Sequence, residues 1–190
     1  MQTLIAITGE AGVGKSTLVK HIKRHAPQTP TASTGQLIRE TYDKDNPPLW
    51  LQMGELAPEA DIRAMVENWI KENQTATSLV LDGMPRIPDQ VTWLDTMADK
   101  YGLDLRVLML EASEELKSQR IKERNRAGDE FHDARSAKDA NRMRKTKARM
   151  IEKSKTKMTE DWVNTQIVEI NEDTDMDKLA MLVTFMHGLI

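Results

Sequence analysis

Cysteine is absent from this 190-residue sequence, and histidine occurs only four times. A chain without cysteine has no disulfide framework, no thiolate nucleophile and no thiolate metal site. No apolar run approaches the ~20 residues that span a bilayer, and Met1 is not followed by the basic and apolar segments of a secretory signal. We therefore expect a soluble, cytoplasmic protein without a membrane partner. Its chemistry must depend on carboxylates, hydroxyls, lysine, arginine and backbone groups.

The net charge of −3 conceals an uneven distribution of charge along the chain. Residues 117–157 hold 15 of the 27 basic residues and 6 of the 30 acidic ones, which leaves +9 in this segment and −12 in the rest. Such a basic segment can bind either nucleic acid or a polyphosphate. Phe131 is its only aromatic residue, so it lacks the aromatic platform on which unpaired bases stack. We therefore expect a polyphosphate ligand and no nucleic-acid partner.

Short apolar runs alternate with helical patterns along the whole chain. The predicted strands are Leu4–Ile7, Gln28–Ser33, Ser78–Leu81, Leu105–Leu110 and Gln166–Ile170, and the predicted helices cover about 15–25, 58–73, 87–101, 113–125, 136–155 and 175–187. This alternation is typical of an α/β domain in which helices cover both faces of a parallel sheet. We predict a single domain over residues 1–190. In it, residues 34–73 form a small helical insertion and the charged residues 125–135 form an irregular loop.

A glycine-rich segment between the first predicted strand and helix carries the strongest chemical signal. Gly9–Thr17 matches the pattern Gly-x-x-x-x-Gly-Lys-Ser/Thr in the strand–loop–helix context that a phosphate-binding loop requires. The glycines let successive N–H groups converge on anionic oxygens beside a helix N-terminus. Lys15 is expected at the β- and γ-phosphates, and the Ser16 hydroxyl at Mg²⁺. The predicted phosphate-binding residues are Gly9, Gly12, Val13, Gly14, Lys15, Ser16 and Thr17.

Two further motifs follow the second and third predicted strands. Ser33–Arg39 comes after one strand, and Leu81–Gln90, which includes Asp82-Gly83-Met84-Pro85-Arg86, comes after the other. The carboxyl ends of parallel strands meet at one edge of the sheet, so both motifs are expected beside the phosphate-binding loop. Arginine binds phosphate through two parallel hydrogen bonds and stays charged. Arg39 and Arg86 therefore suggest a second phosphate-bearing substrate.

With these motifs in this order, the chain resembles the adenylate kinase family of nucleoside monophosphate kinases. The resemblance implies a P-loop kinase core with a five-stranded parallel sheet in the order 2-3-1-4-5. It implies that Arg39 and Arg86 grip the phosphate of an acceptor monophosphate, that Gln90 contacts its base, and that Asp82 organises Mg²⁺ through water. The acceptor-binding residues implied by the resemblance are Thr34, Gly35, Arg39, Gly83, Arg86 and Gln90.

The resemblance also assigns roles to the basic segment. Residues 125–135 correspond to a short lid without zinc-binding residues, and residues 34–73 to the acceptor-binding insertion. Arg120 corresponds to the arginine near the donor base, and Arg124 to one that faces the transferring phosphoryl group. Arg135 and either Arg142 or Arg144, of which we select Arg144, correspond to lid-side arginines. The implied catalytic residues are Lys15, Arg86, Arg124, Arg135 and Arg144.

Some positions depart from the family pattern and leave the acceptor open. Met84 replaces the usual phenylalanine, Gln36 stands where aspartate is common, Ser16 stands where many members have glycine, and Asp139 alone represents a usual pair of aspartates. We expect a monomer that transfers the γ-phosphoryl group of Mg-ATP to a nucleoside monophosphate, with AMP or dAMP as first choice. The alternatives are another acceptor (CMP, UMP, dGMP or a small alcohol), a nucleic-acid-binding P-loop ATPase, and a catalytically weak regulatory scaffold.

Overall fold

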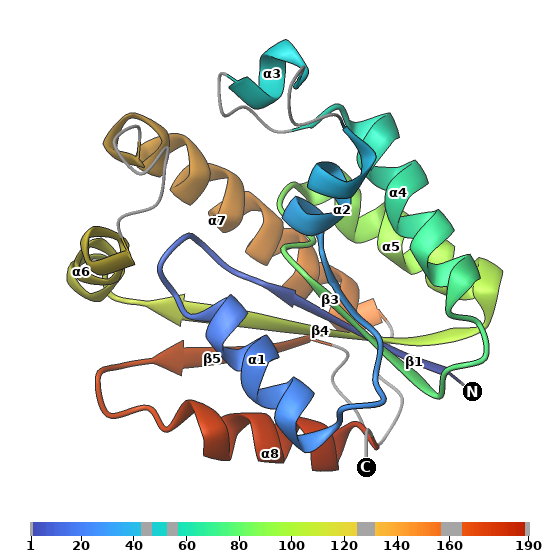
Figure 1. Ribbon diagram of the computed structural model, residues 1–190. Coiled ribbons are helices and arrows are strands. Elements are labelled where there is room, and N and C mark those ends of the chain that lie inside the picture. The colour runs from blue at the N-terminus through green and yellow to red at the C-terminus, as the bar shows by residue number, and fades with distance from the viewer. Residues whose placement is uncertain (1, 43–46, 53–56, 125–131, 157–164, 189–190) are drawn as a thin grey trace.

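The computed structural model describes residues 2–42, 47–52, 57–124, 132–156 and 165–188 (Figure 1). The strands are β1 (Gln2–Thr8), β2 (Thr31–Ser33), β3 (Ser78–Asp82), β4 (Leu103–Ala112) and β5 (Thr165–Ile170). The helices are α1 (Lys15–His25), α2 (Thr34–Thr41), α3 (Leu49–Gln52), α4 (Glu59–Glu72), α5 (Pro88–Tyr101), α6 (Glu114–Arg124), α7 (His132–Thr156) and α8 (Met176–Met186).

The five strands form one parallel sheet in the order β2-β3-β1-β4-β5. This order and the all-parallel pairing confirm the predicted fold class. Ile7 of β1 lies opposite Asp82 of β3, and Ser33 of β2 pairs with the same aspartate. The segments that follow β1, β2 and β3 therefore leave the sheet at one edge, beside one another.

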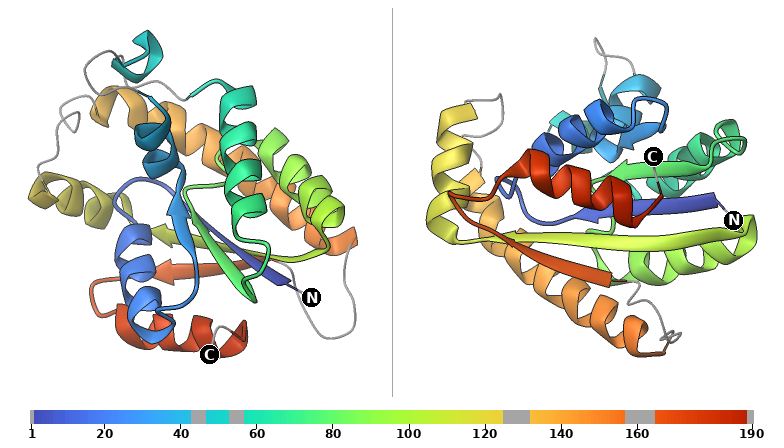
Figure 2. Two further views of the ribbon diagram at one scale, coloured as in Figure 1. Left: turned by 45° about the vertical axis from the view of Figure 1, so that its right-hand side comes forward. Right: turned by 90° about the horizontal axis from the view of Figure 1, so that it is seen from below.

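Alternate residues of each central strand point to opposite faces of the sheet. Leu4 and Ala6 of β1 pack with Leu79 of β3 in one buried cluster, which includes apolar side chains of α4, α5 and α7. Ile5 and Ile7 pack in a second cluster with apolar side chains of α1 and α8. In the right-hand view of Figure 2, α5 and α7 lie on one side of the sheet and α1 and α8 on the other. Burial on both faces explains why these strands appear as continuous apolar runs.

Two predicted boundaries are wrong. The second strand begins at Thr31 rather than at Gln28, because the Thr29 N–H donates to the Ala26 carbonyl in a turn and Pro30 has no N–H to donate. Helix α7 begins at His132, so residues 132–135 belong to a helix rather than to the expected irregular loop. No glycine or proline interrupts the chain after Gly128 until α7 has ended. Residues 125–131 lie outside the described residues.

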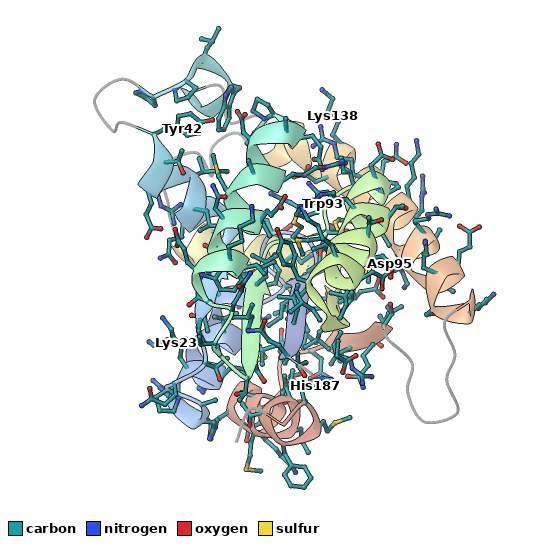
Figure 3. The ribbon with its side chains drawn as sticks, turned by 90° about the vertical axis from the view of Figure 1, so that its right-hand side faces the viewer. Lys23, Tyr42, Trp93, Asp95, Lys138 and His187 are labelled. Atoms are coloured by element: carbon teal, nitrogen blue, oxygen red, sulfur yellow. The ribbon has the colours of Figure 1, made fainter. Side chains whose placement is uncertain are left out.

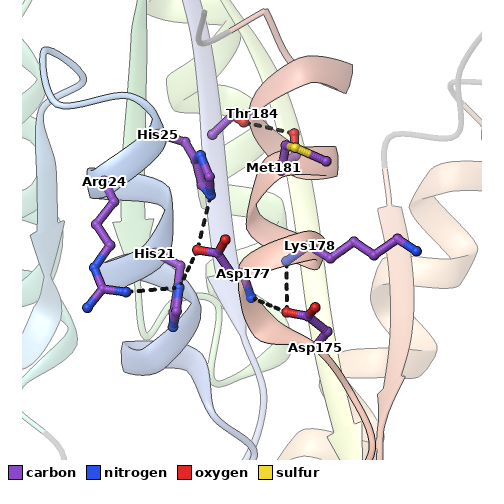
Figure 4. A network of polar contacts seen from close by, with 8 residues as sticks. All are labelled: His21, Arg24, His25, Asp175, Asp177, Lys178, Met181 and Thr184. Atoms are coloured by element: carbon purple, nitrogen blue, oxygen red, sulfur yellow. Dashed lines mark hydrogen bonds and ion pairs between the residues drawn. The ribbon is translucent and has the colours of Figure 1, made fainter.

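The C-terminal helix α8 docks on α1. Ala180 and Val183 pack in the same cluster as Ile22 of α1. Asp177 accepts hydrogen bonds from His21 Nδ1 at 2.6 Å and from His25 Nε2 at 3.1 Å (Figure 4). The bond from His21, and less strongly the one from His25, lowers the pKa of the Asp177 carboxyl.

Across the described parts of the chain, no helix combines the length and apolar character needed to cross a membrane.

Helix α4 is tied to the end of α5 by a carboxylate whose titration gives a pH-dependent prediction. Glu67 accepts hydrogen bonds from Lys100 Nζ at 2.7 Å and from Tyr101 Oη at 2.5 Å, and these bonds lower its pKa from 4.5 to about 2. Because the folded pKa lies below the unfolded one, the stabilisation is present above pH 4.5 and is lost as the pH falls towards 2.

We expect Glu67→Gln to lower the thermal midpoint by a few degrees at neutral pH. The difference from the unchanged protein should shrink between pH 4.5 and about 2, because Glu67 itself becomes protonated there. Thermal unfolding followed by circular dichroism over this range measures the effect. Glu72→Gln, an exposed change on the same helix, should show no such trend. A constant difference across the range would contradict the assignment.

Candidate active site

The loop between β1 and α1 is built to hold an anion. Gly14 is the N-cap of α1, so the partial positive charge of the helix N-terminus faces the loop. Lys15 Nζ donates to the Gly9 carbonyl at 2.9 Å and to the Glu10 carbonyl at 2.7 Å. The loop therefore brings one ammonium group, a helix N-terminus and backbone N–H groups together. This is the arrangement that binds phosphate.

Helix α6 packs against this loop through Lys117. Gly12 has a φ of +83°, and a Cβ there would lie 2.7 Å from the Lys117 carbonyl oxygen. Lys117 is only 5% exposed, and its Nζ lies 2.5 Å from Glu10 Oε2 and 2.6 Å from Glu114 Oε1. Burial alone lowers the pKa of Lys117, but the bonds with the two carboxylates outweigh it and raise that pKa. The Lys117 ammonium therefore stays charged and links α6 to the loop through its ion pair with Glu10.

The Ser16 hydroxyl, at the start of α1, and the Asp82 carboxylate, at the end of β3, lie close together. Ser16 Oγ lies 3.4 Å from Asp82 Oδ2, and Asp82 Oδ1 is buried with no hydrogen-bond partner in the described parts of the chain. Burial raises the pKa of Asp82, while Lys15, Ser16 and Arg86 oppose this shift. The second oxygen of this carboxylate is therefore not engaged by the described residues. The pair fits Mg²⁺, which takes oxygen ligands and is commonly held by one or two side chains plus substrate phosphates.

A pocket of about 500 Å³ opens beside the loop. Arg120 lines it and donates from Nη1 to the Val13 carbonyl at 3.4 Å, while the Val13 side chain is buried in the core. Met176, at the start of α8, lines the pocket near Gly14. Its Cε lies 3.3 Å from the position that a Cβ on Gly14 would occupy. The lining residues are Ala11, Gly12, Gly14, Lys15, Ser16, Thr17, Arg120, Glu123 and Met176.

A second pocket, of about 250 Å³, lies between α2, α4 and the segment after β3. Gly83 has a φ of +93°, and a Cβ there would lie 2.7 Å from Thr34 Oγ1, so this segment packs directly on the start of α2. The structure thus brings five of the six predicted acceptor residues together. The lining residues are Thr34, Gly35, Ile38, Trp50, Ala57, Glu59, Ile62, Gly83, Arg86, Ile87 and Gln90.

The sixth predicted acceptor residue, Arg39, is exposed and does not line this pocket. Gly35 does line the pocket, and Arg39 Nη1 lies 3.3 Å from the position that a Cβ on Gly35 would occupy. Arg39 is therefore placed next to the pocket rather than inside it.

Helix α7 brings further charges to Arg86. Asp139 Oδ2 lies 4.0 Å from Arg86 Nη2, and Asp139 Oδ1 accepts from Arg142 Nη1 at 2.9 Å. Arg144 is exposed and donates from Nη2 to Asn141 Oδ1 at 2.9 Å. Of the two alternatives for the lid-side arginine, the structure therefore connects Arg142 to Arg86. The predicted residues Arg124 and Arg135 lie in α6 and α7, and their side chains lie outside the described residues.

The sequence interpretation missed several residues that line these pockets or, in the case of Lys117, support the phosphate loop. Met176 follows β5 at the same sheet edge as the phosphate loop, and that topology is a signal that could have found it. Glu59 and Trp50 lie in the helical insertion, whose path over the sheet no local pattern specifies. Lys117 belongs to the basic segment, and the sequence pattern there does not distinguish a buried lysine from the solvent-exposed ones.

Comparisons with known proteins agree with this geometry. The family described as "AAA domain" matches residues 8–138 of the chain. An adenylate kinase from Mycobacterium leprae is 29% identical over 131 residues, which cover 66% of this chain and 72% of the relative. Adenylate kinase 1 from Nostoc is 28% identical over 134 residues (67% and 72%), and an adenylate kinase from Thermotoga neapolitana is 28% identical over 131 residues (65% and 59%).

The family match spans well over half of the chain and contains the phosphate loop, the helical insertion and every lining residue of the second pocket. With the five-stranded parallel order of the sheet, it shows that the chain belongs to the AAA domain family, and within that family the chain is similar to adenylate kinases.

Proposed function

We propose that this protein transfers the γ-phosphoryl group of Mg-ATP to a nucleoside monophosphate, with AMP or dAMP as the preferred acceptor. One observation carries the proposal. Asp82 connects the two pockets, because its Oδ2 lies 3.4 Å from Ser16 Oγ, which lines the pocket beside the loop, and the next residue, Gly83, lines the second pocket. A phosphorylated donor and a phosphorylated acceptor can therefore meet at one edge of the sheet. The relatives named adenylate kinase support the same reaction.

In this mechanism the side chains align and neutralise phosphates. Lys15 and the loop N–H groups hold the β- and γ-phosphates of ATP, and Arg86 holds the phosphate of the acceptor. A phosphate oxygen of the acceptor forms a bond to the γ-phosphorus, and the bond from that phosphorus to the β-bridging oxygen breaks, so that ADP leaves. The nucleophile is already an oxyanion, so no general base is needed. Phosphoryl transfer depends mainly on such alignment and charge neutralisation.

Ser16 and Asp82 are the residues that fit the metal. We assign the Ser16 hydroxyl as a direct ligand and the Asp82 carboxylate as a group that orients metal-bound water. When bound, Mg²⁺ neutralises the charge of the β- and γ-phosphates. Arg120 lines the pocket beside the loop and is assigned to the donor, and the resemblance assigns Arg124 and Arg135 to the transferring group. For the second lid-side arginine we propose Arg142 in place of Arg144, because Arg142 shares Asp139 with Arg86.

The test is an acceptor panel with purified full-length protein and Mg-ATP. ADP formation is measured with AMP, dAMP, CMP, UMP, dGMP and glycerol, and formation of the phosphorylated acceptor is confirmed by chromatography. We expect AMP or dAMP to have the highest kcat/KM. If every acceptor gives no more ADP than ATP alone, the proposal is wrong. Stimulation by single-stranded oligonucleotides instead would indicate a nucleic-acid-dependent ATPase, whose binding weakens steeply with salt.

A further inference from the structure

We propose that the exposed face of α8 is a dimerisation surface, on which a second copy of this chain packs its own α8 in antiparallel orientation. This α8 face consists of Met181, Leu182, Phe185 and Met186. The proposal concerns a surface outside both pockets, so it does not depend on the proposed function. It replaces the monomer that the sequence interpretation expects.

The α8 face is apolar although it is exposed. Helix α8 packs Ala180 and Val183 in the buried cluster that it shares with α1. On the other side of the helix, Phe185 is 76% exposed, and the other three residues of the α8 face are 43–47% exposed. Residues 179–186 contain no charged side chain. A helix that is apolar on all sides is typically covered on all sides, so the exposed side calls for a partner.

The area of the α8 face is sufficient for the core of a small interface. If a large side chain has a surface of about 150–250 Å², the four residues together expose roughly 400 Å². Monomeric proteins rarely leave larger apolar patches uncovered. A standard interface buries about 800 Å² on each partner, so the α8 face supplies its apolar core and the surrounding polar residues supply its rim. We expect a dissociation constant in the micromolar range.

The position of α8 leaves this face open to a second copy. In Figure 3, α8, marked near its end by His187, lies at the lower edge of the molecule, and side chains project from it away from the other helices. Tyr42, which follows α2, lies at the opposite end of the molecule. No residue of the α8 face lines the pocket beside the phosphate loop or the second pocket. Covering the face therefore uses no residue of either pocket.

The spacing of the four residues fits a second helix of the same kind. Met181 and Phe185 are four residues apart and form one row along the helix, and Leu182 and Met186 form a second, parallel row. Rows of this spacing pack into the grooves between the rows of a facing helix, which is the commonest arrangement of packed helices. Two copies of the α8 face can therefore interdigitate about a twofold axis, as a symmetric dimer requires.

The charge on the same side of α8 favours the antiparallel orientation. Lys178 stands one turn before Leu182, and Figure 4 shows its side chain directed away from α1. In a parallel pair the two lysines would lie next to each other. In an antiparallel pair each lysine comes close to the last turn of the other helix, where free carbonyls carry a partial negative charge. This orientation places Leu182 against Phe185 of the partner subunit.

A membrane is the other surface that an apolar helix face can enter, and α8 lacks the features for it. Helices that lie in a membrane interface carry several lysines or arginines along the polar face. Lys178 is the single basic residue of α8, and it follows the acidic Asp177. The side of the helix opposite the α8 face is occupied by α1. A second copy of the chain therefore fits this face better than a lipid surface does.

The first test is sedimentation velocity of the purified chain over a range of micromolar concentrations. We expect a reversible monomer–dimer equilibrium. Phe185→Glu should raise its dissociation constant by at least about thirtyfold, because a charge then replaces the most exposed apolar anchor of the face. The matched control is Leu49→Glu, which places the same charge on an exposed leucine of α3 and should leave the equilibrium unchanged. If Phe185→Glu does not keep the circular dichroism spectrum of the unchanged protein, Met181→Glu serves instead.

The absence of cysteine allows the orientation to be tested as well. Leu182→Cys and Phe185→Cys variants, one of them carrying a size tag, are mixed and oxidised mildly, so that every disulfide joins two introduced residues. Antiparallel packing predicts disulfides mainly between the two variants. Disulfides mainly within each variant would overturn the antiparallel orientation.

Two further outcomes would overturn the dimer itself. One is a folded, unchanged protein that sediments as a monomer at every concentration. The other is such a monomer that binds vesicles of phosphatidylcholine and phosphatidylserine, with binding lost in Phe185→Glu, because the α8 face would then be a membrane contact. Neither outcome bears on phosphoryl transfer, which the acceptor panel tests separately.

Discussion

Lys15→Ala is expected to lower the turnover number by at least about two orders of magnitude at saturating ATP and acceptor. The Lys15 ammonium lies within hydrogen-bond distance of two carbonyls of the loop, those of Gly9 and Glu10. Its charge is therefore already placed where the β- and γ-phosphates are expected. Alanine removes this charge but leaves the backbone N–H groups and the N-terminus of α1 in place. ATP should still bind, while the charge that develops during transfer is no longer neutralised.

The control for this prediction is Lys20→Ala. Lys20 is an exposed lysine of the same helix and does not line the pocket beside the loop. Both variants should keep the far-ultraviolet circular dichroism spectrum of the unchanged protein, and only Lys15→Ala should lose activity. Near-normal turnover of a folded Lys15→Ala protein would show that the glycine-rich loop is not the site of the donor phosphates.

The sheet could be predicted because its strands are buried on both faces. Leu4–Ile7 and Ser78–Leu81 are continuous apolar runs, and such runs bounded by turn residues indicate strands of a covered parallel sheet. The glycine-rich loop could be predicted for a different reason, since all its functional residues lie within one local segment. The short edge strand β2 was predicted too long, because two prolines and a turn determine where its pairing starts.

The contacts that refine the site could not be predicted in the same way. Gln90 and Glu59 are 31 residues apart, and Lys117 and Glu10 are 107 residues apart. Both pairs depend on how α4 and α6 are placed over the edge of the sheet. A glutamate at the start of a helix is usually a stabilising surface residue. Nothing in the sequence near Glu59 distinguishes that role from the lining of a pocket.

Arg86→Ala is expected to lower turnover with every acceptor by at least about two orders of magnitude. The Arg86 side chain lines the acceptor pocket, its charge reaches Asp82, and it lies near Asp139 of α7. It therefore lies where the proposed reaction brings the acceptor phosphate to the γ-phosphoryl group. Arg86→Lys should recover only part of the activity, because an ammonium cannot form the two parallel hydrogen bonds that a guanidinium forms with phosphate. The control is Arg149→Ala: Arg149 of α7 bonds with Glu152 and with Thr92 of α5 and lines neither pocket, so this variant should have normal kinetics.

The backbone of Arg86 makes a second readout possible. Its N–H orients the Gln90 amide, and alanine retains this N–H. The variant should therefore turn over slowly and yet keep the ratio of kcat/KM for AMP to that for UMP, since the proposed base contact is Gln90, whereas the guanidinium is proposed to bind the phosphate. A steady-state measurement with both acceptors checks the two effects together. Normal kinetics with every acceptor would remove Arg86 from the acceptor site. A collapsed ratio would mean that phosphate binding and base selection in this pocket are not separate.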